Sequence, residues 1–320
     1  MRGLELAEQC WAEWGRLMVS QHFGPYEDRI AAGLVGEGSE CFGFDDELSR
    51  DHDWASGFCM WLTEDDLALF GEDLQERYDV ACREFCTPPS GVVDPNAGKR
   101  RGVFGVKAFY SRFIYYDHVP QTLAEWRSLP EAYLATATNG KVFSDPLGEF
   151  TAFREGLLAF YPEDVRLKKL AARCAAAAQA GQYNYGRCIA RGELVAAHSA
   201  LTAFAEAAMS ITYLLNKRYR PFYKWMHRGV ADLPVLGASC HGILADLFAD
   251  TGAGGCQTAT EAGSPADKAT LIEELSAAIG QELVKEGLSE SDGDFLMDHA
   301  YSVQDRIEDE ELRCLHVMAE

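Results

Sequence analysis

The residues best suited to chemistry gather in one segment, residues 34–54, with the sequence LVGEGSECFGFDDELSRDHDW. Gly38 and Ser39 follow an apolar run, and a loop there would present backbone N–H groups and a hydroxyl to an anion such as phosphate. Eleven residues separate Ser39 from Asp51. On a strand, Asp51 and Asp53 would share one face, about 6–7 Å apart at ~3.3 Å per residue. Two such carboxylates can hold hard divalent cations, with substrate phosphates completing the ligand shell.

Charge restricts the class of partner. The chain of 320 residues carries 29 Lys and Arg against 50 Asp and Glu, a net charge of −21. Residues 1–100 carry −13, residues 101–260 carry +4 and residues 261–320 carry −12. The overall balance argues against duplex nucleic acid, whose binding depends on neutralising phosphates with basic side chains, and against an anionic membrane surface. It leaves room for a metal–nucleotide complex between the acidic first segment and the basic middle.

The first half of the chain is expected to combine strands and helices around this segment. A buried strand is expected over 30–35, leading into the Gly38-Ser39 loop, and a second over 53–62. The aromatic and β-branched residues of 103–116 suggest a third strand, and Asn139-Gly140 is typical of a hairpin turn. Helices are expected over 4–22 and from Thr63, as N-cap, to about 86.

The second half reads as helical. Residues 151–228 and 268–320 show helical spacing, and residues 250–267 form a polar, low-complexity linker. The predicted fold class is therefore α+β, with a nucleotide-binding type of domain over 1–150 and a helical domain with acidic C-terminal helices over 151–320. We expect no membrane-spanning helix. Because the first residues lack the apolar core of a signal peptide, we expect reduced thiols and a cytoplasmic location.

The spacing of Gly38-Ser39, Gly43 and the pair Asp51-x-Asp53 resembles the nucleotidyltransferase superfamily that includes aminoglycoside-modifying enzymes. The segment GSECFGFDDELSRDHDW is similar, more specifically, to a bacterial family known as domain of unknown function 4037. Further matches to that family are Gly140-Lys141-Val142-Phe143-x-Asp145, Tyr161-Pro162-x-Asp164-Val165, Gly181-Gln182, Arg191-Gly192-Glu193, Tyr219-x-Pro221-x-x-Lys224-Trp225 and Leu315-His316-Val317-Met318. The resemblance implies a mixed-sheet nucleotidyltransferase-like domain followed by a helical bundle.

The resemblance also implies roles for the motif residues. Asp51 and Asp53 would bind Mg²⁺, and Gly38 and Ser39 would hold a nucleoside triphosphate, with ATP as the expected donor. A third carboxylate on a later strand usually completes such a site, but the stretch 103–110 contains no acid. The resemblance therefore leaves both the third ligand and catalytic activity open.

Cations are needed to stabilise the leaving pyrophosphate, and a base would help to deprotonate the acceptor hydroxyl. Arg187 and Arg191 fall within about 40° of His198 on a helical wheel, if one helix runs through Gly192. With Lys224, these arginines are the candidate phosphate-binding cations; surface salt bridges are the alternative explanation. Glu193, beside Arg191, is the candidate base.

Three functions fit these observations. The first is a metal-dependent nucleotidyltransferase that transfers a nucleoside monophosphate to a small-molecule acceptor. The second is a nucleotide-binding regulatory pseudo-enzyme, suggested by the missing third carboxylate. The third is nucleotidylation of a partner protein. The acceptor and the oligomeric state are not determined by the sequence.

Overall fold

The computed structural model describes residues 2–47, 57–85, 100–249 and 264–320. The chain divides into two compact units. The first unit comprises Met1–Gln121 and Leu129–Ala159, and the second comprises Thr122–Ser128 and Phe160–Glu320. The second unit therefore takes one short helix, α6 (Leu123–Ser128), from the first half of the chain.

The first unit contains a four-stranded sheet with the order β3-β2-β1-β4. Its strands are β1 (Ala31–Leu34), β2 (Cys59–Leu62), β3 (Gly102–Gly105) and β4 (Lys141–Ser144). β1 is antiparallel to both β2 and β4, whereas β2 and β3 are parallel. A mixed sheet packed with helices confirms the predicted α+β class.

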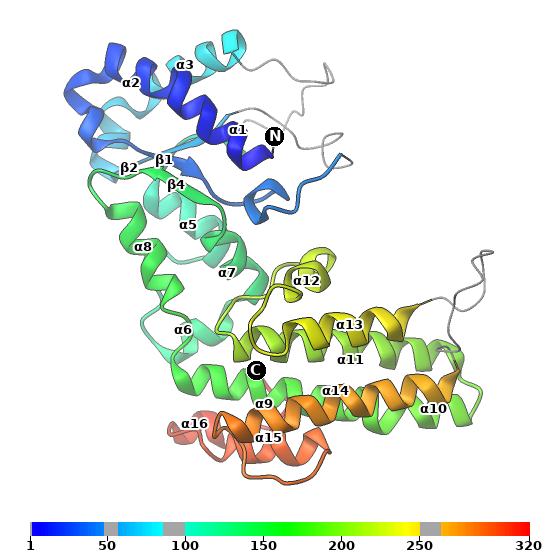
Figure 1. Ribbon diagram of the computed structural model, residues 1–320. Helices are drawn as coiled ribbons and strands as arrows, with labels where there is room; N and C mark the ends of the chain where they lie inside the picture. The colour runs from blue at the N-terminus through cyan, green and yellow to red at the C-terminus, as the bar shows by residue number, and fades with distance from the viewer. Residues whose placement is uncertain (1, 48–56, 86–99, 250–263) are drawn as a thin grey trace. The chain divides into compact units, whose positions relative to one another are not determined.

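Helices cover both faces of this sheet (Figure 1). One layer holds α1 (Gly3–Cys10), the π-helix η1 (Trp11–Gly15), α2 (Arg16–Phe23) and α3 (Glu64–Phe85); the other holds α5 (Val106–Ile114), α7 (Glu131–Thr138) and α8 (Glu149–Leu158). Two 3₁₀ turns, η2 (Gly24–Arg29) and η3 (Glu40–Phe42), flank β1. The predicted first helix, the strand near 30–35 and the helix from Glu64 are confirmed.

The two helical layers contact side chains on opposite faces of β2. Phe58 lies just before β2 and packs against Trp14 and Tyr78, with ring centroids 5.0 and 5.4 Å away. Trp61, three residues later, stacks on Phe150 of α8 at 3.7 Å. Because strand side chains alternate between faces, an odd separation sends these two aromatic groups into different layers. The sheet therefore has a buried aromatic core on each side.

Two sequence predictions in the first unit are wrong. The proposed third strand over 103–116 is a strand only through Gly105 and then becomes α5. The Asn139-Gly140 pair is not a hairpin turn, because it joins α7 to β4. Gly140 nevertheless has the positive φ, 65°, that the dipeptide signals.

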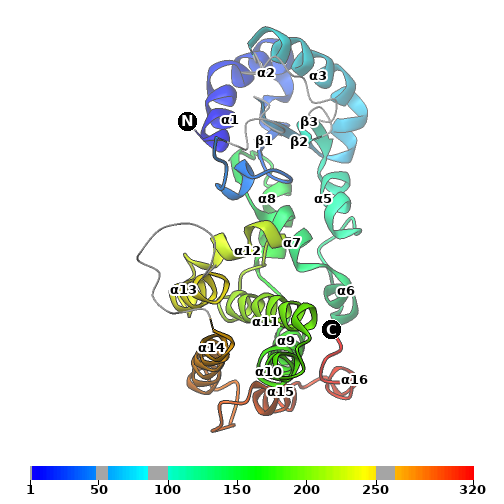
Figure 2. The same ribbon diagram turned by 90° about the vertical axis from the view of Figure 1, so that its right-hand side faces the viewer.

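The second unit is a helical bundle. A helical run comprises α9 (Glu163–Ala177), the π-helix η5 (Ala178–Tyr185) and α10 (Gly186–Ala190). The other helices are α11 (Leu194–Leu215), α12 (Tyr223–Val230), α13 (Gly237–Phe248), α14 (Pro265–Lys285), α15 (Leu296–Gln304) and α16 (Glu310–Arg313). Figure 1 shows α9, α11, α13 and α14 lengthwise, and Figure 2 shows them nearly end-on. The predicted helical second half is confirmed.

α11 corrects the expectation that no segment reaches membrane-spanning length. By length and composition alone it is long and apolar enough to cross a membrane, with a mean hydropathy of 1.4 over its best window. In the bundle it packs against α9, η5, α12, α13 and α14. Its buried residues include Phe204 and Ile211, both 0% exposed. A central helix with this many neighbours is apolar for packing reasons.

Candidate functional site

The loop after β1 carries Gly38 and Ser39, as the sequence predicted. Gly36 and Gly38 have φ values of 121° and 124°, a region that L side chains rarely adopt. A Cβ on Gly38 would overlap the Glu40 carboxylate, so this position also requires glycine for space. Ser39 precedes the short η3 turn and its carbonyl accepts from the Phe44 N–H at 2.9 Å. The sequence from Gly36 to Ser39 thus forms a tight, specific loop.

The side chain of Asn139, the residue just after α7, clamps this loop through hydrogen bonds. Its amide side chain accepts from the Gly36 N–H at 2.9 Å and donates to the Gly36 carbonyl at 2.8 Å. The next N–H, that of Gly140, donates to the Cys41 carbonyl at 2.8 Å. Arg154 donates in turn to the Asn139 carbonyl at 2.9 Å. The α7–β4 junction therefore holds the loop on both sides of Gly38-Ser39.

Glu40, which follows Ser39 in this loop, forms a buried ion pair with Arg101. Glu40 and Arg101 are 4% and 8% exposed, and Arg101 Nη2 donates to Glu40 Oε1 at 2.8 Å. Burial works to lower the pKa of Arg101, but the Glu40 carboxylate next to it raises that pKa above its ordinary value. The Arg101 guanidinium therefore stays charged in the interior. The Cys59 thiol nearby stays protonated, since burial raises its pKa to about 12.

Further arginines approach the exposed side of the loop. Glu37, whose side chain is 52% exposed, has its carboxylate 3.6 Å from Arg100 Nε and 3.9 Å from Arg112 Nη2. The Arg112 guanidinium also lies 5.5 Å from the Phe104 ring centroid, a cation–π arrangement. Sequence reasoning missed these arginines, although the Lys99-Arg100-Arg101 run at the end of a glycine-rich stretch was a usable signal. The loop thus has cationic surroundings suited to an anion.

The predicted metal ligands, Asp51 and Asp53, lie outside the described residues. Within the described residues, no group of three His, Cys, Asp or Glu side chains could hold a metal ion. Glu40 is committed to Arg101, and β3 carries no acid. The described part of the site therefore does not by itself fit a metal, and the assignment depends on Asp51 and Asp53.

The candidate cations of the second unit do not form the predicted stripe. α10 ends at Ala190, and Gly192 has φ 72°, so no single helix runs from Arg187 to His198. The helical-wheel grouping is therefore wrong, because the glycine turns the chain. Arg187 instead stacks on Tyr183, 4.6 Å from its ring centroid. Arg187 and Arg191 are both exposed.

Glu193 and Lys224 also lie on the surface of the second unit. Glu193 is the exposed N-cap residue of α11, and Lys224 is exposed on α12. α12 packs near Tyr213, whose hydroxyl donates to the Met226 carbonyl at 3.1 Å. Tyr213 is about 30 Å along α11 from Glu193, at ~1.5 Å per residue. The structure thus places Lys224 near the opposite end of α11 from the two arginines.

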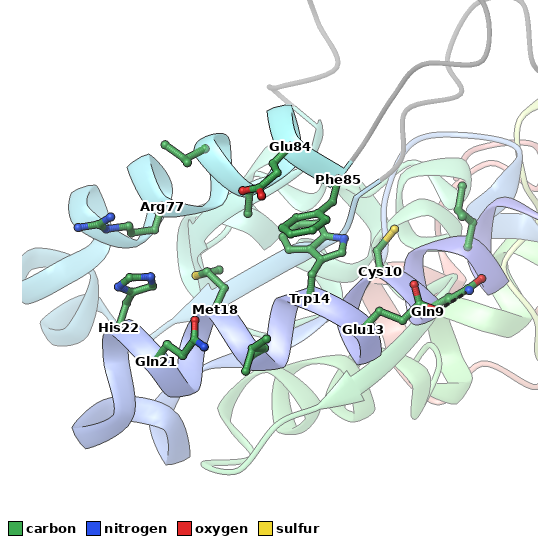
Figure 3. Close-up of a pocket in the computed structure, with 14 residues that line it drawn as sticks. Gln9, Cys10, Glu13, Trp14, Met18, Gln21, His22, Arg77, Glu84 and Phe85 are labelled. Carbon is green, nitrogen blue, oxygen red and sulfur yellow. Dashed lines mark hydrogen bonds between the residues drawn. The ribbon is translucent and has the colours of Figure 1, made fainter.

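A separate groove of about 820 Å³ lies between the α1–η1–α2 segment and α3. Figure 3 shows Trp14 and Phe85 stacked at one part of it, with ring centroids 6.1 Å apart and planes 15° apart. Arg77 and His22 lie toward the other end, as Figure 3 also shows. This groove contains none of the site residues that the sequence predicted.

The comparisons with known proteins bear on the helical and junction segments. The family model described as "Domain of unknown function (DUF4037)" matches residues 126–226. The resemblance to DUF4037 is confirmed over these residues. The DUF4037 match includes Asn139, Arg187, Arg191, Glu193 and Lys224, and it begins after the Gly38-Ser39 loop.

A solved structure is also similar to this chain. It is described as the crystal structure of a nucleotidyltransferase-like protein from Exiguobacterium sibiricum 255-15, with 11% identity and a TM-score of 0.35. The match covers 87% of this chain and 81% of that chain. No curated protein sequence is significantly similar to this chain.

Proposed function

We propose that this protein is a metal-dependent nucleotidyltransferase of the cytoplasm, which transfers a nucleoside monophosphate from ATP to a small-molecule acceptor. In this proposal Gly38 and Ser39 bind the triphosphate, and Asp51 and Asp53 bind Mg²⁺. Arg187 and Arg191 are proposed to stabilise the pyrophosphate, and Glu193 to act as the base; Lys224, near the opposite end of α11, is left out of this step. These residues of the second unit lie within the segment that matches DUF4037.

The observation that carries the proposal is the built loop around Gly38-Ser39. Two glycines with positive φ open the backbone, Asn139 clamps one side, and the Glu40–Arg101 pair fills the space beneath it. A loop held this firmly can present N–H groups to an anion with little loss of conformational entropy on binding. Arg100 and Arg112, which now face Glu37, supply positive charge at the same loop. These features favour a phosphate-bearing substrate.

The proposed reaction is an in-line displacement at the α-phosphorus. The acceptor oxygen forms a bond to that phosphorus, the bond to the β-phosphate oxygen breaks, and pyrophosphate leaves. The hydroxyl proton passes to Glu193 in this scheme. A bound Mg²⁺ would supply charge neutralisation on the phosphates. The role of the loop and its arginines is to orient the triphosphate and neutralise its charge, which is the main part of catalysis in phosphoryl transfer.

Label transfer from α-labelled ATP tests the proposal. With Mg²⁺ and a panel of small hydroxyl-bearing acceptors, the wild-type protein should release pyrophosphate and label a small molecule. Asp51→Asn and Asp53→Asn should each lower turnover on the order of 100-fold or more, because each removes a proposed metal ligand. Asp28→Asn, at an exposed position in η2, is the matched control and should leave turnover unchanged. Wild-type turnover in both aspartate variants would refute the proposed site.

A regulatory, non-catalytic role is the second candidate, and one observation favours it. β3 consists of Gly102, Val103, Phe104 and Gly105, so the strand that would carry a third carboxylate has none. This role predicts that ATP raises the melting temperature while no pyrophosphate is released against any acceptor. Measuring both quantities on one preparation separates the two functions.

A further inference from the structure

A cluster of basic side chains lies in the second unit, on α6 and α9. Lys169 and Arg173 are four residues apart on α9 and therefore share one face of that helix. Arg127 reaches the same place from α6. The side chains of Lys169 and Arg173 are 5% and 21% exposed. The cluster is thus partly buried, which strengthens its electrostatic interactions relative to those of exposed charges.

One carboxylate of the same chain occupies this cluster. Arg173 contacts Glu320 with two nitrogens, Nε to Oε1 at 2.7 Å and Nη2 to Oε2 at 2.8 Å. Lys169 Nζ lies 4.0 Å from Oε2, and Arg127 Nη2 donates to the Glu320 main-chain oxygen at 3.0 Å. The forked guanidinium geometry suits a carboxylate and a phosphate equally well. Glu320 therefore has the position that a bound oxyanion would take.

The segment leading to Glu320 is held by a buried lysine. Lys168 is 0% exposed and donates to Gln304 Oε1 at 2.7 Å, to the His316 carbonyl at 2.8 Å and to the Val317 carbonyl at 3.3 Å. Figures 1 and 2 show the chain end beyond α16 returning toward α6 and α9. We call residues 314–320 the strap. Its anchor at Lys168 leaves Glu320 at the tip, where the side chain is 27% exposed.

Several basic side chains converge on Glu320. Three cationic groups contact Glu320, through its side-chain carboxylate and its main-chain oxygen. The Arg127 charge also acts on a neighbour: burial first, and then Arg127, lower the pKa of Lys168 to about 8. A phosphate group carries more negative charge than a carboxylate and has three acceptor oxygens. It would therefore offer this cluster more acceptor oxygens and more negative charge than the Glu320 side-chain carboxylate does.

We propose that Arg127, Lys169 and Arg173 form a second anion site, for a phosphate group, in which Glu320 is a built-in competitor carried by a displaceable strap. The site needs no metal and is independent of the proposed reaction at Gly38-Ser39. Because a ligand shifts an equilibrium only through its differential affinity for the two states, a phosphate-bearing ligand would bind the strap-open state and shift the protein toward it. Removing the competing carboxylate must then tighten binding.

Calorimetric titration with inorganic pyrophosphate in EDTA tests this site while silencing any Mg²⁺-dependent site. Glu320→Gln should tighten pyrophosphate binding about fivefold, which corresponds to losing one modest competing interaction. Arg173→Met should weaken binding about tenfold. Glu8→Gln, which removes an exposed carboxylate paired with Lys141 in the first unit, is the control and should have no effect. Binding should also survive in an Asp51→Asn, Asp53→Asn double variant, so failure here is distinct from failure of the proposed function.

Hydrogen exchange gives an independent measurement on the wild-type chain. Saturating pyrophosphate should speed amide exchange in residues 314–320, since displacement of Glu320 loosens the strap. Equal affinities for pyrophosphate and ATP would show that the site recognises the phosphate group alone. Tighter binding of ATP would show that the site also recognises the nucleoside, and either result supports the site. Absence of pyrophosphate binding to folded Glu320→Gln, or equal affinities in wild type, Glu320→Gln and Arg127→Met, would overturn it.

Discussion

Three carboxylate–guanidinium pairs of this chain differ in how far their side chains are exposed to solvent. The Glu40–Arg101 side chains are 5% and 9% exposed, and those of Glu320 and Arg173 are 27% and 21% exposed. The first pair lies under a loop in the sheet unit, and the second joins the strap to the bundle. The comparison shows that burial determines the role of each pair. Breaking a desolvated pair costs much free energy, so that pair acts as a structural support, whereas a partly solvated pair can open.

The third pair combines one buried member with one exposed member. Asp66 on α3 is 4% exposed and Arg29 is 44% exposed, with Arg29 Nε donating to Asp66 Oδ1 at 2.8 Å. Thr63 supports the carboxylate by donating its hydroxyl to Asp66 Oδ2 at 2.9 Å. The series predicts that the cost of breaking each pair follows the burial of its members.

Arg101→Met should give the largest effect. It leaves the Glu40 carboxylate buried without its partner, so we expect a loss of about 3–5 kcal/mol in the free energy of unfolding. Urea denaturation followed by circular dichroism measures this loss. The double variant Glu40→Gln, Arg101→Met should recover part of it, because no isolated charge remains buried. A loss below ~1 kcal/mol in the single variant would show that the pair is not a support.

Asp66→Asn should have an intermediate effect of about 1–2 kcal/mol, since it weakens hydrogen bonds to a charged group whose partner stays solvated. Burial acts to raise the pKa of Asp66, but the hydrogen bonds from Arg29 and Thr63 bring that pKa below its ordinary value. The stabilisation is therefore fully present above the ordinary carboxyl pKa and is lost as pH falls through the lowered one. Denaturation of both proteins between pH 7 and pH 2 should show the difference shrinking only at the acidic end. A difference that is unchanged at pH 2 would contradict this origin.

Glu320→Gln should have the smallest effect on stability, about 0.5–1 kcal/mol, because an ion pair that stays partly solvated contributes less than a buried one. The loss should decrease further in 1 M NaCl, where the Debye length is about 3 Å. The loss caused by Arg101→Met should change little with salt, since buried pairs are screened weakly. Equal salt dependence in the two variants would remove the distinction between support and strap.

Helices and strands were predicted correctly where the spacing of apolar residues alone indicates them. The prediction failed where residue composition and spacing indicate different elements. Residues 103–116 are rich in strand-forming side chains, yet the buried positions Val106, Phe109, Tyr110 and Phe113 follow the i, i+3, i+4, i+7 spacing of α5. The helical period was present in the sequence and outweighs residue type. A single glycine, Gly192, likewise ended a helix that propensity alone would have continued.

The site was predictable only in part for a different reason. Gly38-Ser39 follows directly from a strand-to-loop pattern, so it could be located from adjacent residues. Glu40 and Arg101 are 61 residues apart, and Gly36 and Asn139 are 103 apart. No local pattern specifies such pairs, because they exist only once the sheet has formed. The supporting residues of a loop are therefore harder to predict than the loop itself.

The Asn139 clamp has a consequence for how the chain acquires its structure. Gly36 obtains both clamp hydrogen bonds from a residue 103 positions later, and β1 also pairs with β4 at Lys141 and Val142. Contacts this distant in sequence form late, because the entropy of closing a long stretch of chain must be overcome first. During synthesis, β1 therefore waits for the α7–β4 junction to leave the ribosome before its loop is complete. Completion of the Gly38-Ser39 loop thus requires that the α7–β4 junction has folded.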